Sequence, residues 1–137
     1  MPDFPQYQNA ELVEYASYKT TVLTGSSGAS ITANPGDVIV VEVNVQNVSG
    51  TATVTLPAVA LGGPVLVKFS STAAGTVHGT AAVVSVVPAA ADVTAGAKID
   101  GSYGSVQLNN IADQVLFASD GTNWWIIDKY HNTHDSY

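Results

Sequence analysis

The histidines are the side chains best suited to metal binding, and their spacing is suggestive only near the end of the chain. His131 and His134 are three positions apart, with Asp135 adjacent to the second. On a helix this spacing could hold a metal ion, but the segment follows a predicted strand and offers no evident third ligand. His78 lies in a loop of small residues. We therefore expect solvated histidines, no metal site and no cofactor.

The acidic side chains do not form a recognisable catalytic pair. Glycosidases need two carboxylates that face each other across the cleaved bond, and no spacing in this sequence selects such a pair. Calcium needs several oxygen ligands at short spacing, as in an Asp-x-Asp loop, and that pattern is absent. Asp37, Asp100 and Asp120 each lie beside a glycine and are expected to form turns. The other acids between residues 37 and 130 are Glu42, Asp92, Asp113 and Asp128.

Nucleophilic catalysis has no better support. The Gly-x-Ser-x-Gly pattern of a nucleophile elbow does not occur. Residues 25–28 read Gly-Ser-Ser-Gly, which is a flexible turn, because the lysine and the helix of a phosphate-binding loop are missing. We therefore expect that the chain is not an enzyme.

Two adjacent tryptophans, Trp124 and Trp125, are the most informative aromatic residues. Neighbours on a strand face opposite sides of the sheet, so we expect one ring to cover the core. The other ring then needs a second cover, which could be another subunit, a ligand or the N-terminal segment. With Tyr103 nearby, the pair could instead form a platform on which a sugar ring stacks. The alternatives are therefore core plus subunit interface, or ligand stacking.

Composition limits the possible partners. The chain has 137 residues, enough for one domain, and is 46% hydrophobic but only 11% charged. Low charge suggests that partners cover much of the surface. The net charge is −7 and arginine is absent, so we expect neither nucleic acids nor anionic membranes as partners. Without cysteine there is no disulfide, and we expect neither a signal peptide nor a membrane span.

Short apolar runs separated by turn signals predict an all-β fold. The segment 37–48 alternates apolar and polar residues, and 81–87 is nearly all apolar, as in a central strand. Asp-Gly at 120–121 between two apolar runs predicts a closing hairpin. About eight or nine such strands indicate an antiparallel β-sandwich or barrel-like module. We assign residues 1–20 to an N-terminal arm, 21–130 to the β module and 131–137 to a polar tail.

The N-terminal arm is unusually aromatic. It contains Phe4, Tyr7, Tyr15 and Tyr18 within its first eighteen residues. Disordered segments are usually poor in aromatic residues, which favours an ordered arm bound to a partner. A disordered terminus is the alternative.

An ordered set of short motifs resembles a small β module of tailed-phage structural proteins. The matching segment runs from residue 37 to 127, about two-thirds of the chain. Each motif is short, and the order and spacing carry the resemblance. The motifs, in order, are Thr-Val-Thr-Leu-Pro at 53–57, the turn and strand at 62–70, Ile-Asp-Gly at 99–101, Ser-Val-Gln-Leu at 105–108, and Ser-Asp-Gly-Thr-Asn-Trp at 119–124.

The resemblance implies a module that trimerises and occurs in capsid decoration proteins and at tail-fibre tips. This chain has no long stem and no repeats, so we expect a capsid decoration, or cement, protein that binds the outside of a phage head. The expected partners are the major capsid protein and two further copies of the chain. The protein would be made in the host cytoplasm and would end on the capsid surface. A receptor- or glycan-binding tip module of a tail fibre is the alternative.

Two sets of residues are therefore candidate contact sites. Phe4, Tyr7, Tyr15 and Tyr18 are expected to form a capsid-binding arm. One of Trp124 and Trp125 is expected in the interface of a homotrimer, because a large exposed ring beside Ile126 and Ile127 would create an apolar patch.

Overall fold

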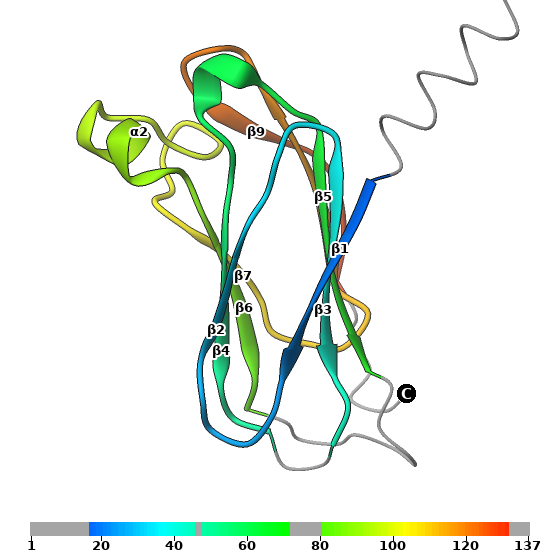
Figure 1. The fold of residues 1–137 in the computed structure, drawn as a ribbon. Helices are drawn as coiled ribbons and strands as arrows, with labels where there is room; N and C mark the ends of the chain where they lie inside the picture. The colour runs from blue at the N-terminus through cyan, green and yellow to red at the C-terminus, as the bar shows by residue number, and fades with distance from the viewer. Residues whose placement is uncertain (1–16, 46–47, 72–80, 132–137) are drawn as a thin grey trace, which may run out of the picture.

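The computed structural model describes residues 17–45, 48–71 and 81–131, which form a two-layer β-sandwich (Figure 1). Nine strands, a 3-10 turn and a short helix are present in these ranges. They are β1 (Ser17–Leu23), β2 (Ala29–Thr32), β3 (Asp37–Val43), β4 (Thr51–Thr55), η1 (Val59–Leu61), β5 (Val65–Ser71), β6 (Val83–Val87), α2 (Ala90–Thr94), β7 (Val106–Leu108), β8 (Gln114–Ser119) and β9 (Trp124–Tyr130). The predicted all-β sandwich is confirmed.

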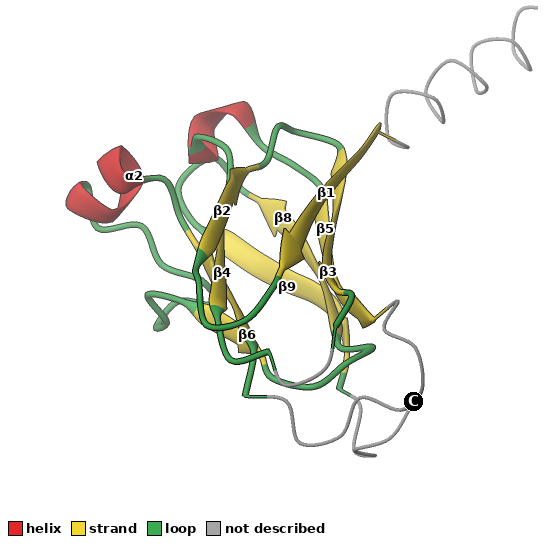
Figure 2. Cartoon of the chain, turned by 60° about the horizontal axis from the view of Figure 1, so that its bottom comes forward, coloured by secondary structure: helices red, strands yellow, loops and turns green. Residues whose placement is uncertain are grey.

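Consecutive strands alternate between the two layers. Sheet A has the strand order β1-β3-β5-β8-β9, and sheet B has the order β2-β4-β6-β7. Up to β6 the chain crosses to the other sheet after every strand and returns. Figure 2 shows the loops that make these crossings at both ends of the sandwich.

The antiparallel pairing predicted from the sequence is wrong for most of the sandwich. The pairs β1–β3, β3–β5, β2–β4 and β4–β6 are parallel, and only β5–β8, β8–β9 and β6–β7 are antiparallel. The physical reason is the alternation: a strand that returns to its own sheet after one pass through the other runs in its original direction. The turn signals therefore mark corners between sheets as well as hairpins.

The turn at Asn34 illustrates such a corner. Gly36 has a φ of 86°, and the carboxylate of Asp37 accepts a hydrogen bond from the Asn34 backbone N–H at 2.7 Å. The same carboxylate lies 3.1 Å from Nζ of Lys19, so this buried acid is paired. The turn carries the chain from β2 in sheet B to β3 in sheet A.

The core lies between the sheets and follows the alternation of each strand. Ile39, Val41 and Val43 of β3 face Val54 and Val86 of the other sheet, and all five are fully buried. The side chains between them point outward. This period of two is the pattern expected of strands that are covered on one face only.

Several segments differ from the sequence-based expectation. β3 ends at Val43, and Val45 is exposed because the chain leaves the sheet there. Ala90 and Ala91 form the start of α2 in a segment where no helix was predicted, since alanine is the best helix former. β7 lies in sheet B, where it pairs with β6, and β8 and β9 form the closing hairpin predicted at the Asp-Gly turn. Residues 17–20, assigned to the arm, belong to β1, while residues 1–16 lie outside the described ranges.

Candidate interaction surface

The two tryptophans face opposite sides of β9, as predicted. Trp124 is 0% exposed and its ring packs against the backbone of Gly63, where an added Cβ would lie 3.0 Å from the ring. Trp125 is 39% exposed and lies opposite Ala118 on the outer side of sheet A. The ring that covers the core is therefore Trp124, and the ring that lacks a cover is Trp125.

A β-bulge displaces the second half of β9. Phe117 pairs with Ile126 and Leu116 pairs with Asp128, so Ile127 is the extra residue between them. Ile127 is 60% exposed. The bulge allows both Trp125 and Asp128 to lie on the outer side of the sheet, on either side of an exposed isoleucine.

The turn before β9 fixes the Trp125 ring. The carboxylate of Asp120 accepts hydrogen bonds from the backbone N–H groups of Asn123 and Thr122, both at 2.8 Å, and from Nε1 of Trp125 at 2.9 Å. These bonds, the one from Asn123 foremost, hold the pKa of Asp120 below its usual value. The turn predicted from Asp-Gly therefore also orients the exposed tryptophan.

The outer side of sheet A, which we call face A, is unusually apolar. None of its side chains is buried, and its charged members are Glu42, Lys68 and Asp128. Its apolar and aromatic members, placed by strand register, are Tyr18, Val22, Val38, Val40, Leu66, Leu116, Ala118, Trp125 and Tyr130. Exposed apolar surface of this kind usually marks a contact site.

Face A is hollowed on its β8–β9 side. The hollow has a volume of about 460 Å³, and its floor is formed by Leu66 and Leu116. Its remaining lining residues are Gln114, Asp128, Lys129 and Tyr130. The site therefore combines an apolar floor with hydrogen-bonding groups at its rim, a combination suited to a partly polar ligand.

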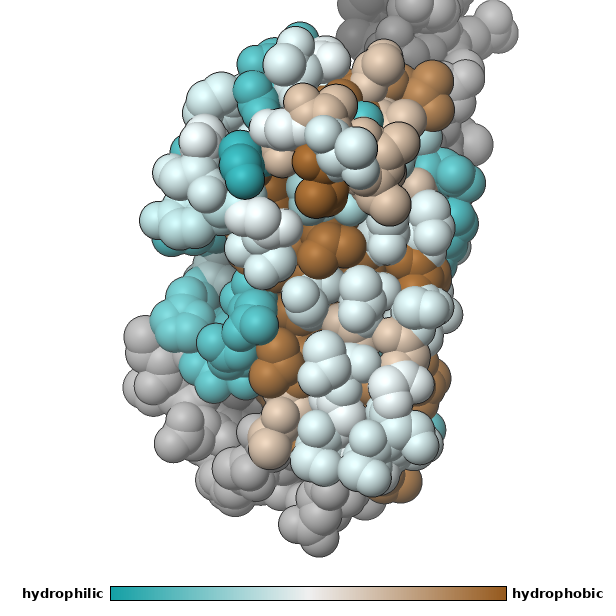
Figure 3. All heavy atoms as spheres, turned by 90° about the vertical axis from the view of Figure 1, so that its left-hand side faces the viewer, coloured by the Kyte–Doolittle hydropathy of each residue, from teal (hydrophilic) through white to brown (hydrophobic). Residues whose placement is uncertain are grey.

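The outer side of sheet B, which we call face B, is different. It carries no charged side chain at its strand positions, and its rows are mostly hydroxyl-bearing: Ser30, Thr32, Thr51, Thr53, Thr55 and Ser85, with Gln107, Val83 and Val87. Figure 3 shows mainly the pale colours of weakly polar residues on this side of the molecule, interrupted by apolar atoms. Hydroxyl groups can bind water, so face B can remain solvated.

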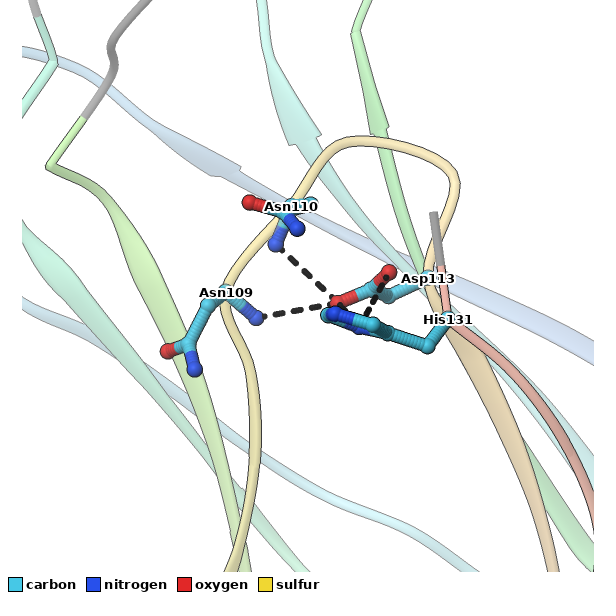
Figure 4. Close-up of polar contacts among 4 residues, drawn as sticks. All are labelled: Asn109, Asn110, Asp113 and His131. Atoms are coloured by element: carbon cyan, nitrogen blue, oxygen red, sulfur yellow. Dashed lines mark hydrogen bonds and ion pairs between the residues drawn. The ribbon is translucent and has the colours of Figure 1, made fainter. Parts of the chain in front are cut away.

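A third feature, which sequence reasoning missed, joins Asp113 to His131 (Figure 4). The buried carboxylate of Asp113 accepts the backbone N–H groups of Asn109 at 3.1 Å and Asn110 at 3.0 Å. Its other oxygen lies 3.2 Å from Nδ1 of His131. His131 was predicted to be a solvated tail residue; it lies directly after β9, its side chain is 59% exposed, and the sequence did not reveal its pairing with Asp113.

This pair lies at one end of a groove between the edge strands β7 and β9. The groove has a volume of about 160 Å³, and Val106, Val115 and Ile126 are among its lining residues. The pair fastens the end of β9 to the loop after β7, and so joins the two sheets. Asp113 and His131 are eighteen positions apart, and the sequence contains no pattern that predicts their contact.

Several predicted residues cannot be assigned to this surface. Phe4, Tyr7 and Tyr15 lie outside the described residues, as do His78 and His134. Tyr18 lies on β1 with its side chain on face A, so it belongs to the module and not to the arm. Tyr103 is exposed in the loop before β7, close to the Gly101 turn against which the Trp125 ring lies.

Within residues 17–45, 48–71 and 81–131, no group of three or more His, Cys, Asp or Glu side chains is arranged to hold a metal ion. No helix in those ranges is long and apolar enough to cross a membrane. Asp100 and Asp120 lie in turns as predicted. Around Asp100 the carbonyl of Ile99 accepts the backbone N–H of Ser102 at 3.2 Å, and the carboxylate of Asp120 accepts the backbone N–H groups of Thr122 and Asn123.

No protein-family model matches the sequence, and no curated protein aligns with it significantly.

Proposed function

We propose that this protein is a virion structural protein that decorates the outside of a phage head and cements it. The observation that carries the proposal is face A, an apolar sheet surface of which no described side chain is buried, with Trp125, Tyr130 and Tyr18 on it. A surface of this kind is expected of a protein whose work is to contact other proteins. The resemblance of the ordered motifs to a phage structural module supports the major capsid protein and further copies of the chain as those partners.

The mechanism is thermodynamic and needs no chemistry. A protein that binds the assembled shell but not its separate subunits stabilises the shell by mass action, and each occupied site contributes RT ln(1 + [L]/Kd). The module, as a homotrimer, provides the body of the cement. The aromatic residues before β1 are proposed to lie across neighbouring capsid subunits.

Two features of the described residues favour this proposal over catalysis. The buried acids Asp37 and Asp113 are both engaged in pairing and backbone hydrogen bonds. The carboxylate of Asp120 is likewise occupied by three hydrogen bonds. These acids stabilise turns and loops, and a general acid or base would need a carboxylate that reaches a substrate.

The direct test uses heads of the encoding virus prepared without this protein. We expect the full chain to bind these heads and to raise the temperature at which they release their DNA. Heads that bind no protein at micromolar concentration would contradict the proposal. Head binding is measured by co-sedimentation and head stability by a DNA-binding dye.

The role of the arm requires its own variant. Because β1 begins at Ser17, the deletion should end at residue 16 to keep the module intact. We expect this deletion, or replacement of Phe4, Tyr7 and Tyr15 by serine, to weaken head binding by at least tenfold. Replacing Gln6 and Gln8 by serine is the matched control and should have no effect. Undiminished binding of the deletion variant would exclude the arm while leaving decoration by the module in place.

The second candidate function is glycan binding at a tail-fibre tip. The observation that favours it is the half-exposed ring of Trp125, held by Asp120 and lying beside the turn before Tyr103. A flat ring in a fixed orientation can stack on a sugar. A glycan array with Trp125→Ala and Tyr103→Ala as variants separates the two functions. Sugar binding that both variants abolish would favour the tip module.

A further inference from the structure

Two aromatic rings with an acid between them lie in a row along the outer side of β9. The row consists of Trp125, Asp128 and Tyr130, which pair with three successive outward-facing residues of β8. Trp125 is 39% exposed and Tyr130 is 48% exposed. Since outward positions on a strand are about 7 Å apart, the two aromatic positions are separated by about 14 Å. We call these three residues the β9 row.

The β-bulge in β9 creates this row. Without the extra residue, the regular alternation that begins at Trp125 would make Ile127 and Lys129 the next outward-facing residues. Asp128 and Tyr130 would then face the core side of the sheet. Bulges at sheet edges and beside active sites re-aim side chains in this way. The bulge therefore brings a carboxylate and a second aromatic ring onto face A.

The first ring of the row is restrained by its own chain. Nε1 of Trp125 donates a hydrogen bond to the carboxylate of Asp120 at 2.9 Å. The far edge of the indole lies 3.9 Å from the position that a Cβ on Gly101 would occupy. The ring is thus held while part of it stays exposed. A side chain that is already oriented loses little conformational freedom when a ligand stacks on it.

The middle of the row is polar and adjoins an apolar floor. Asp128 is exposed, and no described residue donates a hydrogen bond to its carboxylate. It lines the hollow on face A together with Gln114, above Leu66 and Leu116. Carboxylate and amide groups bind hydroxyl groups, whereas an aliphatic floor suits C–H groups. The site therefore fits a ligand with hydroxyl groups at its edge and C–H groups on its faces.

The charges beside the hollow suit an uncharged ligand. On face A, Asp128 is negative and Lys68 is positive, with Nζ of Lys68 3.5 Å from Oε1 of Gln114. Each would repel a ligand of its own sign, whereas a neutral ligand with hydroxyl groups can bind both. The net charge of −7 further disfavours a polyanion. Neutral carbohydrate has the required chemistry, since hydroxyl groups surround each sugar ring and C–H groups cover its faces.

We propose that the β9 row binds an uncharged glycan chain that runs along the strand. Sugar rings stack on Trp125 and Tyr130, and the sugar between them lies over the hollow and donates hydroxyl hydrogen bonds to Asp128. The glycan runs from Trp125 toward Tyr130, whereas Tyr103 lies beyond the Trp124 end of the strand. The inference goes beyond decoration and does not rest on it, because the β1–β3 part of face A remains available for other proteins.

The first test screens the full chain against an array of uncharged oligosaccharides of increasing length. Acidic oligosaccharides and basic peptides are the comparison ligands on the same array. We expect binding to the uncharged oligosaccharides, with an affinity that rises until the ligand spans the two rings, about 14 Å, and then stays constant. Titration calorimetry measures the affinity. Affinity that is complete with a single sugar would contradict an extended site.

The second test assigns the bound glycan to the β9 row. We expect Trp125→Ala and Tyr130→Ala each to weaken binding about tenfold, because each removes a stacked ring. Tyr130→Phe keeps the ring and should retain binding. Asp128→Leu should weaken binding at least about tenfold, whereas Asp128→Asn keeps an acceptor and should cost less. Circular dichroism confirms that each variant is folded.

Tyr18→Ala is the matched control. Tyr18 is an exposed aromatic residue on the same face, but β3, β5 and β8 separate its strand from β9. This variant should bind the glycan as the wild type does. A loss equal to that of Trp125→Ala would overturn the β9 row as the site. A loss with Tyr103→Ala but not with Tyr130→Ala would also overturn it, since the glycan would then lie at the loop end.

The outcomes separate this inference from the proposed function. Absence of binding to every uncharged oligosaccharide at millimolar concentration would overturn the glycan site. Binding only to acidic oligosaccharides or to basic peptides would overturn it as well. Neither result affects decoration, which is tested by binding of the same protein to heads. Conversely, a chain that binds uncharged glycans through the β9 row and fails to bind heads would support this inference and contradict decoration.

Discussion

Face A and face B are the two outer surfaces of one sandwich, and they are built from the same strand geometry. No side chain at the strand positions of either face is buried, and each face has few or no charges. Face B exposes threonine and serine hydroxyls, whereas face A exposes valine, leucine and aromatic rings. Polar hydroxyls allow an uncharged sheet to face water, but an apolar sheet needs a cover. The difference favours face A as the side that contacts a partner.

The largest expected effect is on the free energy of unfolding, when the inward-facing Trp124 and the outward-facing Trp125 of β9 are each replaced by alanine. Trp124→Ala should lower the free energy of unfolding by about 3–5 kcal/mol, because it leaves a large cavity in the core. Trp125→Ala should lower it by less than about 1 kcal/mol and should act mainly on binding at face A. Guanidinium unfolding at low protein concentration measures both. Equal losses for the two variants would mean that Trp125 supports the fold as much as Trp124.

A lysine introduced on each face tests whether face A, and not face B, takes part in self-association. Val38→Lys on face A should raise the dissociation constant for self-association at least about 30-fold, because burying an unpaired ammonium is costly. Thr53→Lys, at the matching interior position of face B, should change it by less than about threefold, within the scatter expected of a solvated site. Sedimentation equilibrium measures both. If Thr53→Lys is the more damaging variant, the roles of the two faces are reversed.

The Asp113–His131 pair lies outside both faces. Its variants therefore serve as a control that should change the stability of the fold without changing self-association. Asp113→Asn should cost about 1–2 kcal/mol, because a neutral amide oxygen accepts the two backbone N–H groups less strongly than a carboxylate does, and an NH2 group replaces the carboxylate oxygen that faces the imidazole. His131→Ala should cost less than about 1 kcal/mol, since the imidazole is partly exposed. Thermal unfolding gives the costs. Self-association should be unchanged, and a change would place this end of β9 in the interface.

The smallest expected effect is the loss in acid of the stability that the Asp120 carboxylate provides through its hydrogen bonds, including the one from Trp125. The pKa of Asp120 is lowered by its hydrogen bonds, so the carboxylate adds stability that is complete above its unfolded-state pKa near 3.8. This stability is lost as pH falls through the lower, folded-state pKa. The difference in unfolding midpoint between wild type and Asp120→Asn should therefore be constant above pH 5 and shrink below 3.8. A difference that grows on acidification would show the opposite sign of pKa shift.

Much of the local structure was predictable because its causes are local. Alternation placed Ile39, Val41 and Val43 on the core side of one strand, and the adjacency of Trp124 and Trp125 placed them on opposite sides of another. The Asp-Gly turn at 120–121 was equally evident, since few residues adopt its backbone conformation. Each of these predictions depends on neighbours within a few positions along the chain.

Which strands pair was decided only by the tertiary structure. A period of two is the same for parallel and antiparallel strands, so the sequence could not reveal that β1, β3 and β5 run in one direction. The alternation between sheets also brought Leu66 beside Leu116 on face A, and His131 to Asp113. Amino-acid type determined which surfaces are apolar, because that property belongs to each residue. The position of those surfaces relative to one another is a property of the whole fold, since it depends on strand order and register across distant segments.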